Sequence, residues 1–341
     1  MEAGLIGFSG SGVSTQFDAV LGAGGAATGL SGGRGRLATI PVPDPRLARL
    51  SALCNPKKTT PAGVRLRDIP GLPRGGGNTA NQLASAREVD CLVGVLGVFT
   101  ADDPAATAAA EREALRGELH LADLQLLEGR LDRKRKAATK PTPTRDADRA
   151  EAEALEGVVA RMGDGTPLRD IELPALVRAA LAEQGAATLK PMLWVANCAE
   201  GQLGGTGPDG VLRVCATLEI EAAQLEPADR AELLAAYGVT ELAGPRLLRA
   251  IYEALGCLSF FTIGEDECRA WTLRRGQTAL DAAGVIHTDL ARGFVRAKVC
   301  TYADVDATGG QDEVRRAGKV RTEGKDYVVA DGDVIEVLHS G

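Results

Sequence analysis

The chain has 341 residues, of which 45% are hydrophobic and 25% charged, so it is long enough for two or three globular domains and too apolar for a disordered protein. Its formal net charge of −7 excludes a protein that coats nucleic acid with its whole surface and leaves only local basic patches for such contacts. Seven cysteines without a C-x-x-C pair indicate buried thiols in a reducing compartment. The sequence contains neither a signal peptide nor a run long enough to span a membrane, so we expect a cytoplasmic protein that does not bind membranes.

The first half of the chain alternates between predicted strands and helices. A short apolar strand at residues 4–7 enters a Gly/Ser-rich turn, and a helix is expected over residues 15–21. Further strands are expected at residues 64–67, 91–98, 192–196 and 211–216. Because helical segments separate these strands, the pattern predicts an α/β fold with a parallel sheet covered by helices on both faces.

Residues 101–189 have the composition of a helical hairpin inserted into this sheet domain. Leu115, Leu119, Ala122 and Leu126 recur at helical spacing, and the turn Pro141–Thr144 precedes a second amphipathic stretch. The hairpin carries a basic tip, Arg130–Lys136. Such a tip is either a solvated surface or a contact for RNA phosphates, and the sequence leaves both interpretations open.

The last part of the chain, from Cys257, consists of short alternating runs such as Arg269–Leu273 and Tyr327–Val329, separated by glycine turns. This pattern predicts a small mixed domain with a β-rich core. The expected domain boundaries are 1–100 for the first part of the sheet domain, 101–189 for the hairpin, 190–256 for the second part, and 257–341 for the last domain.

The Gly/Ser-rich turn at residues 7–14 matches the Walker pattern G-x-x-x-x-G-K-[ST] except at one position. Gly7, Gly12 and Ser14 hold their places, but Val13 stands where the lysine belongs. Backbone N–H groups at a helix N-terminus still form an anion site, and the Ser14 hydroxyl is a candidate Mg²⁺ ligand. Loss of the lysine charge weakens phosphate binding and removes a cation that offsets charge in phosphoryl transfer. Taken alone, the turn is equally well explained as a simple strand-to-helix connection.

Three other loops follow expected strands in the order found in GTPases. Asp68-Ile-Pro-Gly71 matches D-x-x-G, in which the aspartate contacts Mg²⁺ through water and the glycine senses the γ-phosphate. Asn197-Cys-Ala-Glu200 and Cys215-Ala216 fall where GTPases carry N-K-x-D and S-A. Cys198 and Glu200 weaken the case for guanine, whereas the Asn197 amide could meet adenine. Glu200 is either a base contact or an ordinary loop carboxylate.

These loops and their surroundings resemble the YchF subfamily of P-loop NTPases. The most specific stretches are Pro41-Val-Pro-Asp-Pro-Arg-Leu47, Lys190-Pro191, Arg269-Ala-Trp-Thr272, Ile286-His-Thr-Asp289, Gly293-Phe294, Ala317-Gly-Lys319, Glu323-Gly-Lys-Asp-Tyr327 and Asp331-Gly-Asp-Val334. The resemblance covers essentially the whole chain. It implies a P-loop G domain with an inserted helical coiled coil and a C-terminal, β-grasp-like TGS domain.

By this resemblance we expect ATP or GTP as ligand, with Mg²⁺ as a weaker expectation, and association with the ribosome or RNA through the basic tip and the TGS domain. We expect a monomer that does not bind DNA. The candidate nucleotide-binding residues are Gly7, Ser9, Gly10, Ser11, Gly12, Val13, Ser14, Thr15, Asp68, Gly71, Asn197 and Glu200.

The departures from the family pattern lie where phosphate chemistry takes place. Besides Val13, Gly10 replaces an asparagine, the first switch at residues 28–36 is glycine-rich, and the second switch after Gly71 is short and lacks a histidine. The sequence therefore predicts a weak NTPase or a pseudo-enzyme. Arg34, Arg36 or Arg74 could supply the missing charge. The alternative is an RNA- or ribosome-binding adaptor whose G domain is only a scaffold.

Overall fold

The computed structural model describes residues 1–22, 26–31, 35–75, 79–203 and 210–340, with the backbone alone for residues 26–31 and 176. The chain forms two compact units: residues 1–38 with 65–244, and residues 39–64 with 245–341. The sequence assigned residues 39–64 to the first part of the sheet domain. In the structure they belong with the C-terminal part, because Leu47 and Leu50 share a buried cluster with Phe261.

The first unit is built on a sheet with strand order β2-β3-β5-β1-β6-β7-β8. Strand β1 pairs in parallel with β5 and β6, β6 pairs with β7, and β7 pairs with β8. The strands are β1 (Glu2–Ile6), β2 (Ala26–Ser31), β3 (Gly35–Pro41), β5 (Gly63–Asp68), β6 (Cys91–Gly97), β7 (Met192–Asn197) and β8 (Leu212–Val214). The predicted α/β class and the parallel sheet are thus confirmed.

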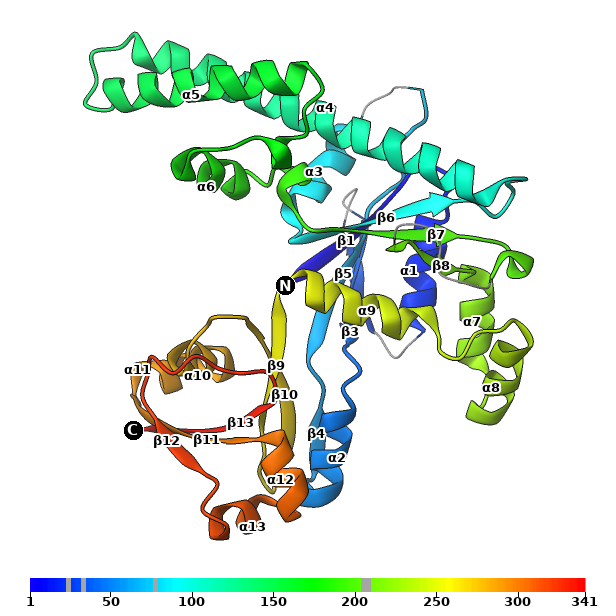
Figure 1. The fold of residues 1–341 in the computed structure, drawn as a ribbon, viewed down its shortest axis with the longest axis vertical. Coiled ribbons are helices and arrows are strands. Elements are labelled where there is room, and N and C mark those ends of the chain that lie inside the picture. The colour runs from blue at the N-terminus through cyan, green and yellow to red at the C-terminus, as the bar shows by residue number, and fades with distance from the viewer. Residues whose placement is uncertain (23–25, 32–34, 76–78, 204–209, 341) are drawn as a thin grey trace. The chain divides into compact units, whose positions relative to one another are not determined.

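Helices cover both faces of this sheet (Figure 1). Helix α1 (Val13–Leu21) packs with α7 (Ala216–Gln224) on one face, and α3 (Ala80–Glu88) with α4 (Pro104–Ala138) lies on the other. Leu92, Leu115 and Leu119 are buried in one cluster between β6 and α4. The remaining helices of the unit are η1 (Leu168–Asp170), α6 (Ala175–Glu183), η2 (Ala187–Leu189), η3 (Glu200–Gln202) and α8 (Pro227–Ala236).

Helix α4 and helix α5 (Arg145–Gly163) form the predicted hairpin (Figure 1). Helix α4 begins at Pro104 after Asp103, whose carboxylate accepts hydrogen bonds from the N–H groups of Ala105 and Ala106. The buried stripe starts at the predicted positions but continues through Leu127, and Leu126 is only partly buried. This shift follows from the 3.6-residue period, which drifts against a seven-residue repeat along a helix of 35 residues.

No helix among the described residues combines the length and the hydrophobicity that a membrane span requires. None of the seven cysteines forms a disulfide, and only Cys54 is not buried. Burial raises the pKa of the Cys198, Cys268 and Cys300 thiols to about 11. These cysteines are therefore protonated packing groups at neutral pH.

The second unit contains a mixed sheet with strand order β12-β11-β13-β9-β10-β4. The strands are β4 (Lys58–Thr60), β9 (Cys257–Thr262), β10 (Glu267–Arg274), β11 (Phe294–Thr301), β12 (Arg321–Glu323) and β13 (Asp333–His339). The helices are α2 (Pro45–Cys54), α9 (Ala243–Ala254), α10 (Ala279–Ile286), α11 (Thr288–Arg292), α12 (Tyr302–Thr308) and α13 (Gln311–Arg316). The predicted β-rich C-terminal part is confirmed.

The expected strand at Tyr327–Val329 is wrong. This segment makes only a single bridge, between Val328 and Thr278. The pairing stops there because Thr278 is the N-cap of α10, so its chain turns into a helix at the next residue. Tyr327 instead donates its hydroxyl to Asp333.

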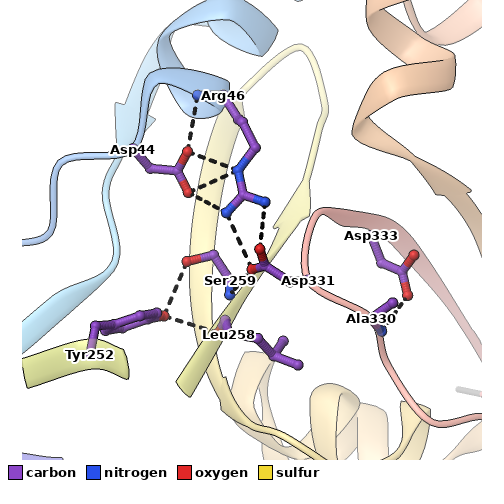
Figure 2. Close-up of polar contacts among 8 residues, drawn as sticks. All are labelled: Asp44, Arg46, Tyr252, Leu258, Ser259, Ala330, Asp331 and Asp333. Atoms are coloured by element: carbon purple, nitrogen blue, oxygen red, sulfur yellow. Dashed lines mark hydrogen bonds and ion pairs between the residues drawn. The ribbon is translucent and has the colours of Figure 1, made fainter. Parts of the chain in front are cut away.

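Arg46 joins two sequence motifs that lie far apart in the chain (Figure 2). Its guanidinium donates to Asp44, the N-cap of α2, and to Asp331 at distances of 2.8–3.3 Å. Asp331 also accepts from the Ser259 N–H at 2.9 Å. Burial disfavours ionisation of Asp331, but these donors outweigh it and lower its pKa. The guanidinium also lies 5.3 Å from the Phe261 ring centroid.

We expect Arg46→Ala to destabilise the second unit by about 1–2 kcal/mol, since Asp44 and Asp331 both lose a charged donor. Urea unfolding followed by Trp271 fluorescence in a Trp194→Phe background measures this unit alone. The matched control is Arg49→Ala on the same helix, because Arg49 forms only an exposed pair with Asp306 of α12 and its loss should cost less stability than the loss of Arg46. Equal losses in the two variants would contradict the structural role of Arg46.

Candidate nucleotide-binding site

Residues 7–12 form a tight loop between β1 and α1. The Ser9 N–H donates to Leu72 O at 2.7 Å, and the Leu72 N–H donates to Gly7 O at 2.8 Å. Gly10 and Gly12 adopt positive φ angles of 86° and 87°, which favour glycine. Gly12 is the N-cap of α1, and no side chain in the described chain caps this end of the helix. The N–H groups of the first helical turn, including those of Ser14 and Thr15, are therefore oriented for an anion.

Val13 occupies the position of the Walker lysine and is turned into the protein. Its side chain is only 5% exposed. A Cβ placed on Gly7 would lie 3.1 Å from Val13 Cγ2, so the isopropyl group fills the space beneath the loop. The loop thus keeps its amides but has an apolar side chain where a cation is expected.

Ser14 and Asp68, the two groups expected to bind Mg²⁺, are bonded to each other. The Ser14 hydroxyl donates to Asp68 Oδ1 at 3.2 Å. Arg36 Nε donates to Asp68 Oδ2 at 2.9 Å, so both carboxylate oxygens have a donor. Asp68 lies at the end of β5 and is buried.

The Arg36 guanidinium is fixed by further contacts with α1. Its remaining nitrogens donate to Asp18 Oδ1 at 2.6 Å and to Ser14 O at 3.0 Å. Its Cζ atom lies 4.7 Å from the Phe17 ring centroid, a cation–π distance. Partial burial favours a lower pKa, but the hydrogen bonds to Asp18 and Asp68 outweigh it and raise the pKa of Arg36. The group is therefore a permanent cation at this site.

This arrangement does not fit Mg²⁺ in the family position. In the family position the ion would be bound by the Ser14 hydroxyl and would contact Asp68 through a water molecule. Here a serine proton and a guanidinium take the Asp68 oxygens. The described residues also contain no group of three or more His, Cys, Asp or Glu side chains that could hold a metal ion.

Of the other two arginines considered as surrogate cations, Arg74 lies near the loop and Arg34 falls outside the described residues. The Arg74 guanidinium lies 4.9 Å from the Phe8 ring centroid and pairs with Glu111 of α4. The second Glu111 oxygen accepts from the Gly97 N–H at 2.8 Å. Arg74 is therefore neutralised by a carboxylate.

Gly71 packs directly on the phosphate loop. A Cβ at this position would lie 2.8 Å from Ser9 Cα, so the close approach requires glycine. The second switch is thereby held against the loop at its first residues. Residues 76–78 of that switch fall outside the described chain.

Asn197 positions loops, and its amide is already in use. Its Nδ2 donates to Ser11 O at 3.1 Å, and its Oδ1 accepts from the Ala216 N–H at 3.3 Å. The residue is buried. A contact with adenine would have to replace one of these bonds, so the structure favours a role in holding the phosphate loop to the strand ends.

Glu200 and Cys198, which follow β7, each contact a neighbouring group of the protein. The exposed Glu200 accepts from the Tyr237 hydroxyl at 2.8 Å, and this bond raises the pKa of Tyr237. Cys198 is buried and directs its thiol to Val214 O at 3.3 Å. It therefore provides no stem to cover a base as the lysine of N-K-x-D does.

Two carboxylates of the site were missed from the sequence. Asp18 lies one helical turn after Ser14, so its position beside the phosphate loop was readable from the helix period. Glu111 lies far along the chain and could be placed only once α4 was docked on the sheet. Together with Asp68 they outnumber Arg36 and Arg74, so these five ion-paired residues carry a net negative charge.

The basic tip of the hairpin is partly neutralised by α5. Arg130 and Lys134 pair with Glu151, and Arg135 pairs with Glu156. Arg133 and Lys136 are exposed and have no ion pair in the described chain. The tip thus presents fewer free positive charges than its sequence suggests.

Comparison with known proteins identifies the family of the chain. It is 34% identical to "Ribosome-binding ATPase YchF" of Bacillus subtilis, with 98% of each chain covered, and 33% identical to the Escherichia coli O157:H7 protein of the same name, with 99% and 98% covered. The chain belongs to the YchF family. The family model YchF-GTPase_C, described as a protein of unknown function (DUF933), matches residues 257–339.

A solved structure of the Schizosaccharomyces pombe YchF GTPase has the same fold. Its TM-score is 0.82 at 24% identity, with 99% of this chain and 97% of that chain covered. The YchF architecture of a P-loop G domain followed by a C-terminal domain therefore holds for this chain.

We expect Gly12→Ala to destabilise the first unit more than Gly10→Ala. Both glycines have the same φ, so both substitutions carry a strain of about 1 kcal/mol. Only at Gly12 would the new Cβ collide with Asn197, 2.1 Å from its Nδ2, whereas Gly10 faces open space. The additional loss should be about 1–2 kcal/mol in urea unfolding followed by Trp194 fluorescence in a Trp271→Phe background. Similar losses in both variants would show that Asn197 does not hold the loop.

Proposed function

We propose that this chain is a ribosome-associated protein that binds ATP or GTP weakly and hydrolyses it slowly or not at all. The observation that carries the proposal is Val13, buried at the position of the Walker lysine in a loop that otherwise keeps its geometry. The relatives at 33–34% identity are named ribosome-binding ATPases, which supports both the ligand class and the partner.

The phosphate loop supports binding of a polyphosphate. Its glycines and the N-terminus of α1 provide amide donors, and Ser14 and Thr15 stand at the first turn. Ser9 and Ser11 line the same loop, and Gly71 holds the second switch against it. The nucleotide base would lie toward Asn197 and Glu200, the loop that follows β7.

The charges around the loop support weak binding. The lysine is absent, and the guanidinium of Arg36 is shared between Asp18 and Asp68. A charged hydrogen bond contributes about 1.5–3 kcal/mol, so the loss of lysine reduces affinity roughly ten- to a hundredfold. Hydrolysis suffers further because no free cation faces the transferred phosphoryl group among the described residues.

Ribosome association would use surfaces outside this loop. We assign it to the exposed Arg133 and Lys136 at the hairpin tip and to residues 257–341, which we interpret as a TGS domain. In this proposal the protein acts as a monomer in the cytoplasm, with RNA phosphates as ligands of the tip.

A second candidate function is a ribosome- or RNA-binding adaptor whose G domain binds no nucleotide. The net negative charge of Asp18, Asp68 and Glu111 against Arg36 and Arg74 favours it. Calorimetry with ATP and with GTP separates the two candidates. Binding at or below about 1 mM supports the first, and its absence supports the adaptor.

We expect Val13→Lys to tighten ATP binding roughly ten- to a hundredfold and to raise the hydrolysis rate, because it restores a positive charge at the amide cradle. Calorimetry gives the dissociation constant, and release of labelled phosphate gives the rate. Val13→Met is the matched control, since methionine is similar in length to lysine but carries no charge. If the unmodified chain already hydrolyses ATP as fast as the lysine variant, the weak-NTPase proposal is wrong.

Replacing Arg133 and Lys136 by alanine should weaken co-sedimentation with ribosomes and reduce its salt dependence. Each removed phosphate contact lowers the slope of log affinity against log salt by about 1. The control is the double variant of Arg161 and Arg178, which are exposed but lie outside the tip. Equal effects of the two double variants would remove the tip from the proposed interface.

A further inference from the structure

Arg36 bridges the Asp68 carboxylate and the main-chain carbonyl of Ser14. Arg36 Nε is 2.9 Å from Asp68 Oδ2, and one terminal nitrogen is 3.0 Å from Ser14 O. A cation therefore already satisfies the carboxylate that would face Mg²⁺ in a P-loop NTPase. The serine hydroxyl, the other expected ligand, is bonded to the same carboxylate.

The guanidinium is held in place and is not a loosely placed surface charge. It spans two carboxylates, Asp68 and Asp18, on two different elements of the first unit. The Phe17 ring packs against it, and its side chain is 32% exposed. A planar guanidinium with donors fixed on three sides matches this set of acceptors, whereas an ammonium would satisfy them one at a time.

We propose that Arg36 is the built-in counter-ion of this site and that the chain takes no divalent cation between Ser14 and Asp68. One consequence of this proposal rests on the proposed function: any nucleotide that binds does so without a metal ion ligated by the protein. Removal of the guanidinium would leave Asp18 and Asp68 as two carboxylates beside a serine hydroxyl, a donor set that suits Mg²⁺.

The first experiment needs no nucleotide. Thermal unfolding of the full chain is followed by Trp194 fluorescence in a Trp271→Phe background, with about 10 mM MgCl₂ or with EDTA at matched ionic strength. We expect the melting temperature of the chain with Arg36 in place to change by less than about 1 °C on adding Mg²⁺. Arg36→Met should be less stable in EDTA and should regain about 3–5 °C with Mg²⁺, because the ion replaces the lost charge.

Two further variants keep the test decisive. Arg36→Lys retains a charge and should remain insensitive to Mg²⁺, with a smaller loss of stability than Arg36→Met. Arg65→Met is the matched control, since Arg65 is a more exposed arginine of β5 that pairs with Glu2. It should show no gain with Mg²⁺.

If Mg²⁺ raises the melting temperature of the chain with Arg36 in place as much as that of Arg36→Met, the proposal is overturned. A melting temperature of Arg36→Met that does not respond to Mg²⁺ would also overturn it. Arg36 would then be a structural residue that does not take the place of a metal ion. Absence of ATP or GTP binding in calorimetry would contradict the proposed function but not these metal responses. The two failures are therefore distinguishable.

Discussion

The ion pair between Arg36 and Asp68 sets the properties of the phosphate site. It joins the end of β5 to the strand that follows the first switch, and through Asp18 and Ser14 O it extends to α1. The carboxylate is buried, and an opposite charge at hydrogen-bonding distance offsets the cost of removing it from water. In other P-loop proteins a metal ion and the Walker lysine bring positive charge to this region. Here a single arginine does so, and its charge is shared by two carboxylates.

The presence of Val13 is consistent with the position of Arg36. A lysine at position 13 would add a second cation near a site whose counter-charge is already present. With valine the same position becomes part of the core, packed beneath Gly7. The loop remains ordered through backbone bonds to Leu72 and through the Asn197 amide, so its shape does not depend on a bound phosphate. The loop can therefore keep the shape found in a YchF fold without the Walker lysine.

The parallel sheet, the helical hairpin and the YchF family were predictable from the sequence, because they rest on hydrophobic periodicity and on motifs confined to short stretches. Positions set by long-range packing were not. The motifs at Pro41–Leu47 and Asp331–Val334 were both recognised, but their contact was not predicted, since Arg46 meets Asp331 only in the folded second unit. Likewise, Arg36 was one of three candidate arginines, and only the geometry showed that it is tied to Asp18 and Asp68. The sequence of the basic tip indicated a patch of positive charge, whereas the structure shows that carboxylates of α5 pair with part of it.

The most direct measurement is anomalous diffraction from crystals of the chain grown with Mn²⁺ and a non-hydrolysable ATP analogue. The account predicts that Arg36 remains bonded to Asp68 and that no manganese peak lies between Asp68 and Ser14. A manganese ion coordinated by these two residues, with Arg36 displaced, would contradict it.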